Sequence, residues 1–230
     1  MAFKGHRVML SRSLVPPEVF DMLHGVLKDN GAEVCLCCNP EFNSSTDFHV
    51  LPSSESEKFA ELAAQGCKIV GPECILRCAK ERRGFPPSPY TCCLTFDGIR
   101  ILSAGFEGPD KTRVHQLVIA MGGEFCIKVS MDVDFVIAKD VLSEKYKWAT
   151  FTLRKPILNM QWLLHCSREH RRVPLEPYRL PIFAGIIMCT TGILLGQRNK
   201  MAELVKENGG TLRADLTVEC THLIAKISSF

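Results

Sequence analysis

The stretch Met121-Gly122-Gly123-Glu124-Phe125 is copied further along the chain as Asn208-Gly209-Gly210-Thr211-Leu212, and this repetition decides the fold. The two glycine pairs lie 87 residues apart (209 − 122). Each stretch runs without a gap to an apolar segment with the composition of a strand, Asp134-Phe135-Val136-Ile137-Ala138 or Thr221-His222-Leu223-Ile224-Ala225. Solenoid repeats have periods of about 20 to 50 residues, so this longer period indicates repeated domains.

A weaker third copy precedes these two. Asn30-Gly31-Ala32-Glu33-Val34 lies 91 residues before the first glycine pair (122 − 31), and residues 69–78 parallel residues 157–166. Proline-rich connectors at 84–90 and 174–181 separate the copies, and prolines stiffen a linker. The sequence therefore predicts three units, at residues 1–88, 91–178 and 182–230.

The second unit shows the order of elements most clearly. Val114, Leu117, Val118 and Met121 fall at i, i+3, i+4 and i+7, which places them on one face of a helix. Gly122-Gly123 ends that helix, because a helix end often needs a residue at positive φ. The other segments are predicted as strands at 98–102, 125–129, 134–138 and 155–158, and as helices at 143–148 and 159–166.

Each unit thus follows the order strand, helix, strand, strand, helix, strand, helix. The third unit is an exception, because it stops at Phe230 after its third strand. A half unit of this kind should expose apolar sheet surface to solvent or to a partner.

These motifs resemble BRCT repeats. The resemblance lies in the glycine pair after the first helix, in Thr221-His222-Leu223-Ile224, and in Trp162 followed four residues later by Cys166. Residues 153–158 and 65–72 resemble, more specifically, the N-terminal three repeats of the DNA topoisomerase II-binding protein family, which has yeast and plant members. The resemblance implies an α/β fold of tandem BRCT repeats, each a four-stranded parallel sheet flanked by three helices, with the last repeat truncated. It also implies that Trp162 is a core residue.

The resemblance further implies binding of phosphoserine or phosphothreonine peptides. A phosphate carries a charge of about −1.5 to −2. In this family it is met by a hydroxyl at the end of the first strand, the next glycine amide, a lysine that opens the second helix, and the N-terminus of the first helix. In the second unit these positions are Ala104, Gly105 and Lys145, with Lys111 as a further basic position. Ala104 lacks the hydroxyl, and strand alternation turns the neighbouring Ser103 to the opposite face.

The other two units carry this pattern incompletely. The third unit has the hydroxyl and the glycine, Thr191-Gly192, and the basic residue Arg198, but its lysine would lie beyond Phe230. The first unit has Leu10-Ser11-Arg12-Ser13 at the strand end, without a glycine, and offers Lys58 only as a loose candidate for the lysine. We therefore expect the first unit to serve for packing and protein contact.

Composition and motifs argue against several other classes of function. The net charge of +3 is weaker than a dedicated nucleic-acid binder usually shows, and no apolar run reaches the roughly 18 residues of a membrane span. One cluster of six cysteines fits no common zinc module: Cys35, Cys37, Cys38, Cys67, Cys74 and Cys78. The cysteines are therefore interpreted as small buried hydrophobes. The sequence contains no P-loop and no nucleophile elbow. We expect a protein without catalytic activity, metal, cofactor or membrane partner.

Together these features predict a nuclear scaffold that binds phosphorylated checkpoint or replication proteins in the DNA damage checkpoint, DNA repair and replication initiation. Meiotic repair is included if the chain is a plant-type relative. Two alternatives stay open. The basic runs at 80–83 and 168–172 each follow a final helix and suit contact with DNA phosphates, although the helix dipole alone favours cations there. Alternatively, the chain is a non-catalytic piece of a larger BRCT-containing enzyme.

Overall fold

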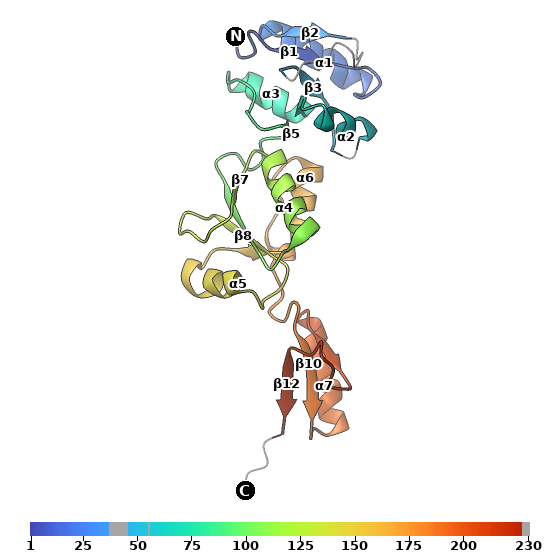
Figure 1. Ribbon diagram of the computed structural model, residues 1–230, viewed down its shortest axis with the longest axis vertical. Coiled ribbons are helices and arrows are strands. Elements are labelled where there is room, and N and C mark those ends of the chain that lie inside the picture. The colour runs from blue at the N-terminus through green and yellow to red at the C-terminus, as the bar shows by residue number, and fades with distance from the viewer. Residues whose placement is uncertain (37–45, 55, 227–230) are drawn as a thin grey trace. The chain divides into compact units, whose positions relative to one another are not determined.

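The computed structural model describes residues 1–36, 46–54 and 56–226, which form three sheets in succession along the chain (Figure 1). The first sheet consists of β1 (Arg7–Met9), β2 (Glu33–Cys35), β3 (Phe48–Val50), β4 (Lys68–Val70) and β5 (Tyr90–Thr91), in the order β2-β1-β3-β4-β5. Helices α1 (Pro17–Asp29), α2 (Glu57–Ala64) and α3 (Pro72–Lys80) connect its strands. β5 belongs to the connector and pairs with β4, so it covers an edge that four strands would leave open.

The second sheet has the predicted order of elements. Its strands are β6 (Arg100–Ala104), β7 (Glu124–Cys126), β8 (Phe135–Ala138) and β9 (Ile157–Leu158), arranged as β7-β6-β8-β9. The helical segments are α4 (Gly108–Ala120), α5 (Glu144–Trp148), a π-helix (Ala149–Leu153) and α6 (Met160–Glu169). Ser143 and Asn159 cap α5 and α6 as predicted: Ser143 Oγ accepts from Tyr146 N, and Asn159 Oδ1 accepts from Gln161 N.

The third sheet contains the predicted half set of elements. It consists of β10 (Ile187–Thr191), β11 (Thr211–Arg213) and β12 (His222–Ala225), with α7 (Leu195–Glu207) after β10. A short 3₁₀-helix (Glu176–Tyr178) lies in the connector before it. Large hydrophobic side chains on this unit face solvent, with Leu223 on strand β12 and the others on α7 or in loops: Leu194, Leu195, Leu204, Leu216, Val218 and Leu223.

The repetition extends to individual hydrogen bonds. Gly123 N donates to Val118 O at 2.9 Å, and Gly210 N donates to Val205 O at 2.8 Å, 87 residues later. Lys139 N donates to Ala104 O at 3.0 Å, and Lys226 N donates to Thr191 O at 3.2 Å. The carboxyl ends of the first and third strands are therefore joined in the same way in both repeats.

All four strands of the second repeat differ from the predicted bounds, and β6 lies at Arg100–Ala104 where residues 98–102 were predicted. The differences at β7 and β9 have identifiable reasons. β7 ends at Cys126 and not at Val129, and the carbonyl of Ile127 accepts a hydrogen bond from Lys145 Nζ. β9 begins at Ile157 and not at Lys155, since Pro156 has no backbone N–H to donate to a neighbouring strand.

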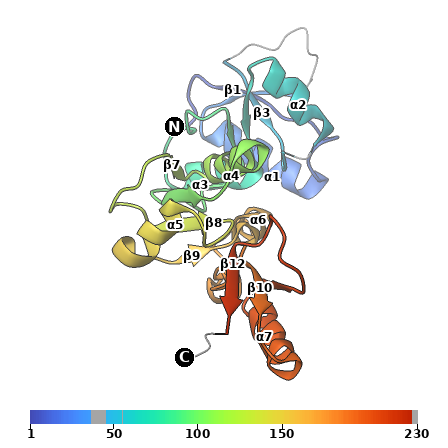
Figure 2. The same ribbon diagram turned by 60° about the horizontal axis from the view of Figure 1, so that its bottom comes forward.

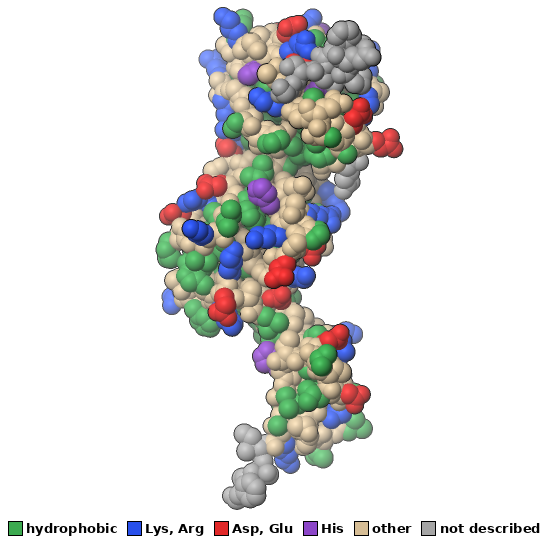
Figure 3. All heavy atoms as spheres, viewed as in Figure 1, with side chains coloured by type: hydrophobic (Ala, Val, Ile, Leu, Met, Phe, Trp, Pro, Cys, Tyr) green, Lys and Arg blue, Asp and Glu red, His purple; other side chains and the backbone are tan. Residues whose placement is uncertain are grey.

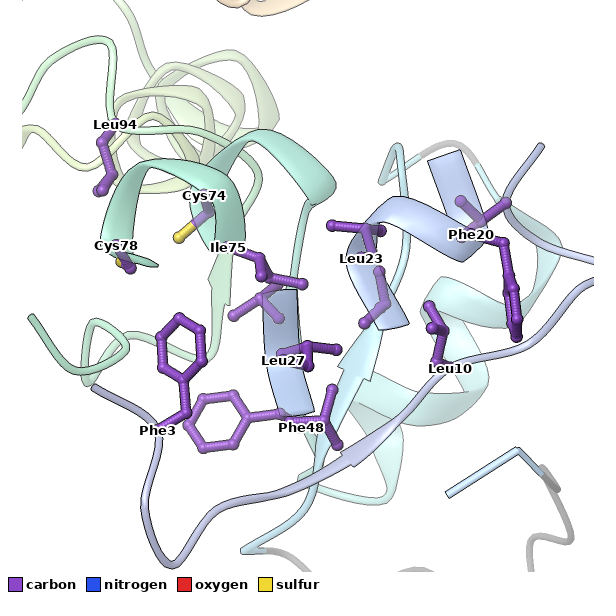
Figure 4. Close-up of a cluster of buried hydrophobic side chains, with 14 residues drawn as sticks. Phe3, Leu10, Phe20, Leu23, Leu27, Phe48, Cys74, Ile75, Cys78 and Leu94 are labelled. Atoms are coloured by element: carbon purple, nitrogen blue, oxygen red, sulfur yellow. The ribbon is translucent and has the colours of Figure 1, made fainter. Parts of the chain in front are cut away.

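The cores confirm the interpretation of Trp162 and of eight of the ten described cysteines, whereas Cys35 and Cys220 are only partly buried. Trp162 is fully buried, and its ring centroid lies 5.0 Å from that of Phe135. In the first repeat, α1 and α3 cover a cluster that includes Phe3, Leu27 and Phe48 (Figure 4). Eight thiols are buried as small apolar groups: Cys67, Cys74, Cys78, Cys92, Cys93, Cys126, Cys166 and Cys189. Cys37 and Cys38 lie outside the described residues.

By its packing the chain divides into two compact units that do not coincide with the repeats. The first contains residues 1–99, 115–124 and 164–173, and the second contains residues 100–114, 125–163 and 174–230. The predicted repeat boundaries stay a prediction. Among the helices of the described residues, none combines the length and the apolar character that a membrane crossing requires.

Candidate functional site

The candidate site lies at the carboxyl edge of the second sheet. In a parallel sheet with the order β7-β6-β8-β9, successive connections diverge between β6 and β8, and ligands of open α/β sheets bind outside the carboxyl ends at such a switch point. Gly105 directly follows β6, and the residues after β8 begin with Lys139. α4 and α5 start from the same edge, and α5 lies beside β8 in both ribbon views (Figures 1 and 2).

Two lysines meet at this edge. Lys111 lies in the first turn of α4, and Lys145 is the second residue of α5, which packs against β6. Burial lowers the pKa of Lys145, and the positive charge of Lys111 lowers that pKa further. Within the described residues neither lysine forms an ion pair. Both ammonium groups therefore keep their charges unpaired within the described residues.

Lys145 is held in place by the backbone. Its Nζ donates to the carbonyl of Ile127 at 2.8 Å, just beyond the end of β7. An ammonium group has three donors, so this contact orients Lys145 and leaves donors for a ligand. Gly105, with φ of +75°, supplies the close backbone approach that the phosphate pattern requires.

The two residues before Gly105 contribute no hydroxyl to this edge. Ala104 is fully buried and belongs to an apolar cluster with Leu102 and Val136. Ser103 is also buried, at 3% exposure, and alternation along β6 places it on the sheet face opposite Ala104.

An acidic residue that the sequence pattern did not single out also lies at this edge. A Cβ built on Gly105 would lie 3.1 Å from Oδ1 and 3.2 Å from Oδ2 of Asp140. The half-buried carboxylate is therefore packed against the glycine itself. The sequence does contain a signal for this position. Asp140 follows the apolar strand 134–138 by two residues, which places it at the carboxyl edge of the sheet, where functional side chains gather.

In the third repeat the residues of the pattern also share one edge. Thr191 is exposed at the end of β10, and Gly192 has a φ of +68°. Arg198 lies in the first turn of α7 and its Nη2 donates to Thr190 O at 3.3 Å. Arg198 Nε and the hydroxyl of Thr190 are buried without a hydrogen-bond partner among the described atoms.

The first repeat corrects the interpretation of Lys58. Ser56 precedes α2 as its N-cap residue and Lys58 is the second residue of the helix, the same position that Lys145 holds after Ser143. Lys58 is therefore the counterpart of Lys145, although the sequence pattern indicated it only as a loose candidate. The glycine is still missing, and the guanidinium of Arg12, next to Ser11, lies 4.8 Å from the ring centroid of Phe20.

His49, in β3 of the first repeat, is buried at 3% exposure, and its Nε2 has no hydrogen-bond partner among the described atoms. Burial lowers its pKa; the charges of Arg7 and Lys58 add to this effect, and Asp47 opposes it. The group is therefore neutral in the fold at a pH where the unfolded chain, with a histidine pKa of about 6.5, takes up a proton.

Acidification should therefore destabilise the protein through His49. The stability contribution is fully present above about pH 6.5 and is lost as the pH falls below it, because the unfolded chain binds the proton more tightly. Between pH 7.5 and 5.5 we expect the native chain to lose more unfolding free energy than His49→Gln does, by at most about 1.4 kcal/mol. Urea unfolding at both pH values measures this difference, and equal losses in the two proteins would contradict it.

The basic helix ends are offset in part by acidic partners. Arg77 Nε lies 2.8 Å from Glu81 Oε1, Arg83 Nη1 lies 2.9 Å from Asp97 Oδ2, and Arg171 pairs with Glu169. On the face shown in Figure 3, cationic and acidic side chains alternate. A surface hollow of about 470 Å³ beside α3 has the same mixed character, and it is lined by Glu73, Leu76, Arg77, Lys80, Glu81, Cys93, Leu94, Thr95 and His170. This pairing favours solvated helix ends over a DNA-binding surface.

The family model described as the twin BRCT domain matches residues 99–162 and 186–229, which contain the second and third sheets. Among curated proteins, Protein ECT2 of mouse is 25% identical over 201 residues, which cover 82% of this chain and 21% of that protein. The S-M checkpoint control protein rad4 of fission yeast is 26% identical over 141 residues, which cover 57% of this chain and 22% of rad4. The chain thus spans about a fifth of the length of these relatives.

Solved structures of similar repeats match as well. The structure of Rad4 BRCT1,2 in complex with a Crb2 phosphopeptide has a TM-score of 0.36 and 16% identity, and the match covers 77% of this chain and 98% of that chain. The structure of yeast Rtt107 has a TM-score of 0.41 and 10% identity, and the match covers 97% of this chain and 63% of that chain.

Proposed function

We propose that this chain, a tandem BRCT-repeat protein by its parallel sheets and its twin BRCT match, is a scaffold that binds phosphorylated peptides. The same two findings confirm the predicted fold class. The candidate phosphate pocket is formed in the second repeat by Gly105, Lys111 and Lys145. The third repeat offers Thr191, Gly192 and Arg198 for the same chemistry.

The observation that carries this proposal is the pair of lysines. Lys111 in the first turn of α4 and Lys145 at the start of α5 follow neighbouring strands of one parallel sheet, and a hydrogen bond of 2.8 Å to Ile127 O holds Lys145 Nζ in place. The charge of Lys111 lowers the pKa of Lys145, and neither lysine forms an ion pair among the described residues. Holding two like charges together is unfavourable, and a phosphate dianion between them relieves the repulsion. The start of α4 adds the positive end of a helix dipole to the same edge.

The missing hydroxyl at Ala104 weakens this pocket without abolishing it. A hydrogen bond to a charged group contributes about 1.5–3 kcal/mol, so the second repeat should bind phosphate less tightly than a repeat with serine or threonine at this position. Thr191 provides that hydroxyl in the third repeat, where the end of β10 leaves it exposed.

Lys145→Glu should weaken phosphopeptide binding by about 10- to 150-fold, because it removes a charge-assisted hydrogen bond worth about 1.5–3 kcal/mol. Titrate the full chain with a phosphothreonine peptide library of degenerate flanks, and with its unphosphorylated counterpart, by fluorescence anisotropy. Lys147→Glu is the matched control, because this lysine is 52% exposed on the same helix and pairs with Glu144. Its substitution should leave the affinity unchanged.

Equal binding of the phosphorylated and unphosphorylated libraries would overturn the proposed function. Equal losses in Lys145→Glu and Lys147→Glu would show that only the net charge of the chain matters. If duplex DNA bound with a steep dependence on salt while the phosphate on the peptide made no difference, the basic helix ends would be the functional surface instead.

The cellular context of the proposal comes from the relatives. Fission yeast rad4 is named a checkpoint control protein, and we propose a related nuclear role in the DNA damage checkpoint and repair, with replication initiation and meiotic repair as finer assignments. The partners would be phosphorylated checkpoint or replication proteins. We propose no catalytic activity for these repeats, since the pocket binds a charged group and needs no reacting side chain.

A further inference from the structure

The carboxylate of Asp140 faces the glycine at which the phosphate is proposed to bind. It lies within contact distance of a Cβ built on Gly105, at 3.1 Å and 3.2 Å for its two oxygens. The register of the sheet explains this position, because Ala104 pairs with Ala138 and the chain segments after both strands leave side by side. Asp140 therefore stands at the mouth of the pocket and not at a distant surface.

Two contacts hold Asp140 there. Its Oδ1 accepts a hydrogen bond from Leu142 N at 3.0 Å, which closes a turn before α5. A Cβ built on Gly185 would lie 2.4 Å from Asp140 Cβ, so the chain passes closely behind the residue. The carboxylate cannot swing far from Gly105 without losing the turn.

The charge of Asp140 is not cancelled by an ion pair within the described residues. The adjacent cation, Lys139, is directed to Asp110, with Nζ 3.5 Å from Oδ2. The pocket thus presents two unpaired cations, Lys111 and Lys145, and one unpaired anion. The third repeat differs, since the corresponding sequence position, 87 residues on, is Ile227, which lies outside the described residues.

We infer that Asp140 determines specificity in the second repeat: it disfavours an isolated phosphate and selects a phosphopeptide with a lysine or arginine directly beside the phosphorylated residue. This inference rests on the proposed function. A dianion at Gly105 is repelled by the carboxylate, and a neighbouring ligand cation offsets that repulsion by pairing with Asp140. Specificity here comes from a repulsive element as well as an attractive one.

The test compares two pentapeptides on two proteins. One peptide has phosphothreonine flanked by alanines, and the other has phosphothreonine flanked by a lysine on each side. In the native chain the lysine peptide should bind about tenfold more tightly, as expected for one close charge pair in a solvated pocket. In Asp140→Asn the alanine peptide should gain about tenfold in affinity and the advantage of the lysines should shrink to near twofold. Asparagine keeps an oxygen to accept from Leu142 N, so the turn survives.

Binding is followed by NMR at the amide of Gly105 in the ¹⁵N-labelled full chain, with the amide of Gly192 reporting on the third repeat in the same sample. Asp132→Asn is the matched control. It removes the same charge from a carboxylate that is 70% exposed and pairs with Arg100, at the opposite end of β6. The control should bind both peptides as the native chain does.

The possible outcomes distinguish a failure of the inference about Asp140 from a failure of the proposed phosphopeptide binding. If the native chain binds at Gly105 and Asp140→Asn leaves both affinities and their ratio unchanged, Asp140 has no role and the phosphate pocket stands. If neither peptide shifts the Gly105 amide in either protein, the pocket takes no phosphate and both claims are overturned. A gain that Asp132→Asn reproduces would assign the effect to net charge and also overturn the inference.

Discussion

Trp162→Ala is expected to lower the free energy of unfolding by about 3–5 kcal/mol, the largest loss that a single core truncation commonly produces. The indole is fully buried, and it packs at 5.0 Å from the ring of Phe135 in β8. Removing it opens a cavity between α6 and the sheet, since the surrounding side chains relax only in part. Urea unfolding followed by circular dichroism measures the loss, provided that both proteins show the same dependence of the unfolding free energy on urea concentration.

Gln161→Ala is the control for this prediction, because the adjacent side chain is exposed on the same helix. Its substitution should change the unfolding free energy by no more than about 0.5 kcal/mol. A loss below about 1 kcal/mol for Trp162→Ala would mean that the helix does not cover the sheet as the structure has it. If Trp162→Ala is too unstable to purify, Trp162→Phe should still unfold earlier than the native chain, since it leaves a smaller cavity.

The repeats could be predicted because their signals are local. Gly122 and Gly209 end helices with φ of +79° and +82°, a conformation that favours glycine, so the sequence must show glycine there. Trp162 and the caps of α5 and α6 follow equally from short motifs. Such features depend on neighbours within a few residues, so they can be predicted without knowledge of the fold.

Asp140 and Lys58 show what a local reading cannot supply. Asp140 meets Gly105 through the register of β6 and β8, although the two residues are 35 positions apart in the chain. The sequence pattern does not identify Lys58 as the counterpart of Lys145. The first repeat lacks the glycine at its strand end and the tryptophan of its last helix, so it aligns only weakly with the second repeat. The N-cap at Ser56 restores that alignment once the helix is seen to begin there. Long-range strand pairing decides the position of Asp140, and the start of α2 decides that of Lys58; residue type alone decides neither.

Gly71→Ala is expected to lower the free energy of unfolding by about 3 kcal/mol, because the added methyl group meets backbone that cannot move aside. A Cβ at this position would lie 2.2 Å from the carbonyl oxygen of Cys92 and 2.8 Å from its carbonyl carbon. The same carbonyl accepts a hydrogen bond from Cys74 N at 3.3 Å, so displacing it also disturbs the start of α3. Gly71 has a φ of −86°, which alanine also adopts, so backbone strain does not contribute. The contact with Cys92 alone determines that the free energy of unfolding falls.

Gly25→Ala adds the same methyl group but is expected to raise the free energy of unfolding. Gly25 lies inside α1, and a Cβ built there has no atom within 4 Å beyond its own helix and chain neighbours. Alanine is the better helix former by about 1 kcal/mol, so this variant should unfold at higher urea than the native chain. Because both substitutions restrict the unfolded chain similarly, their difference isolates the contact with Cys92. If Gly71→Ala proved as stable as Gly25→Ala, the strand leading to Cys92 would not pass over α3 where the structure places it.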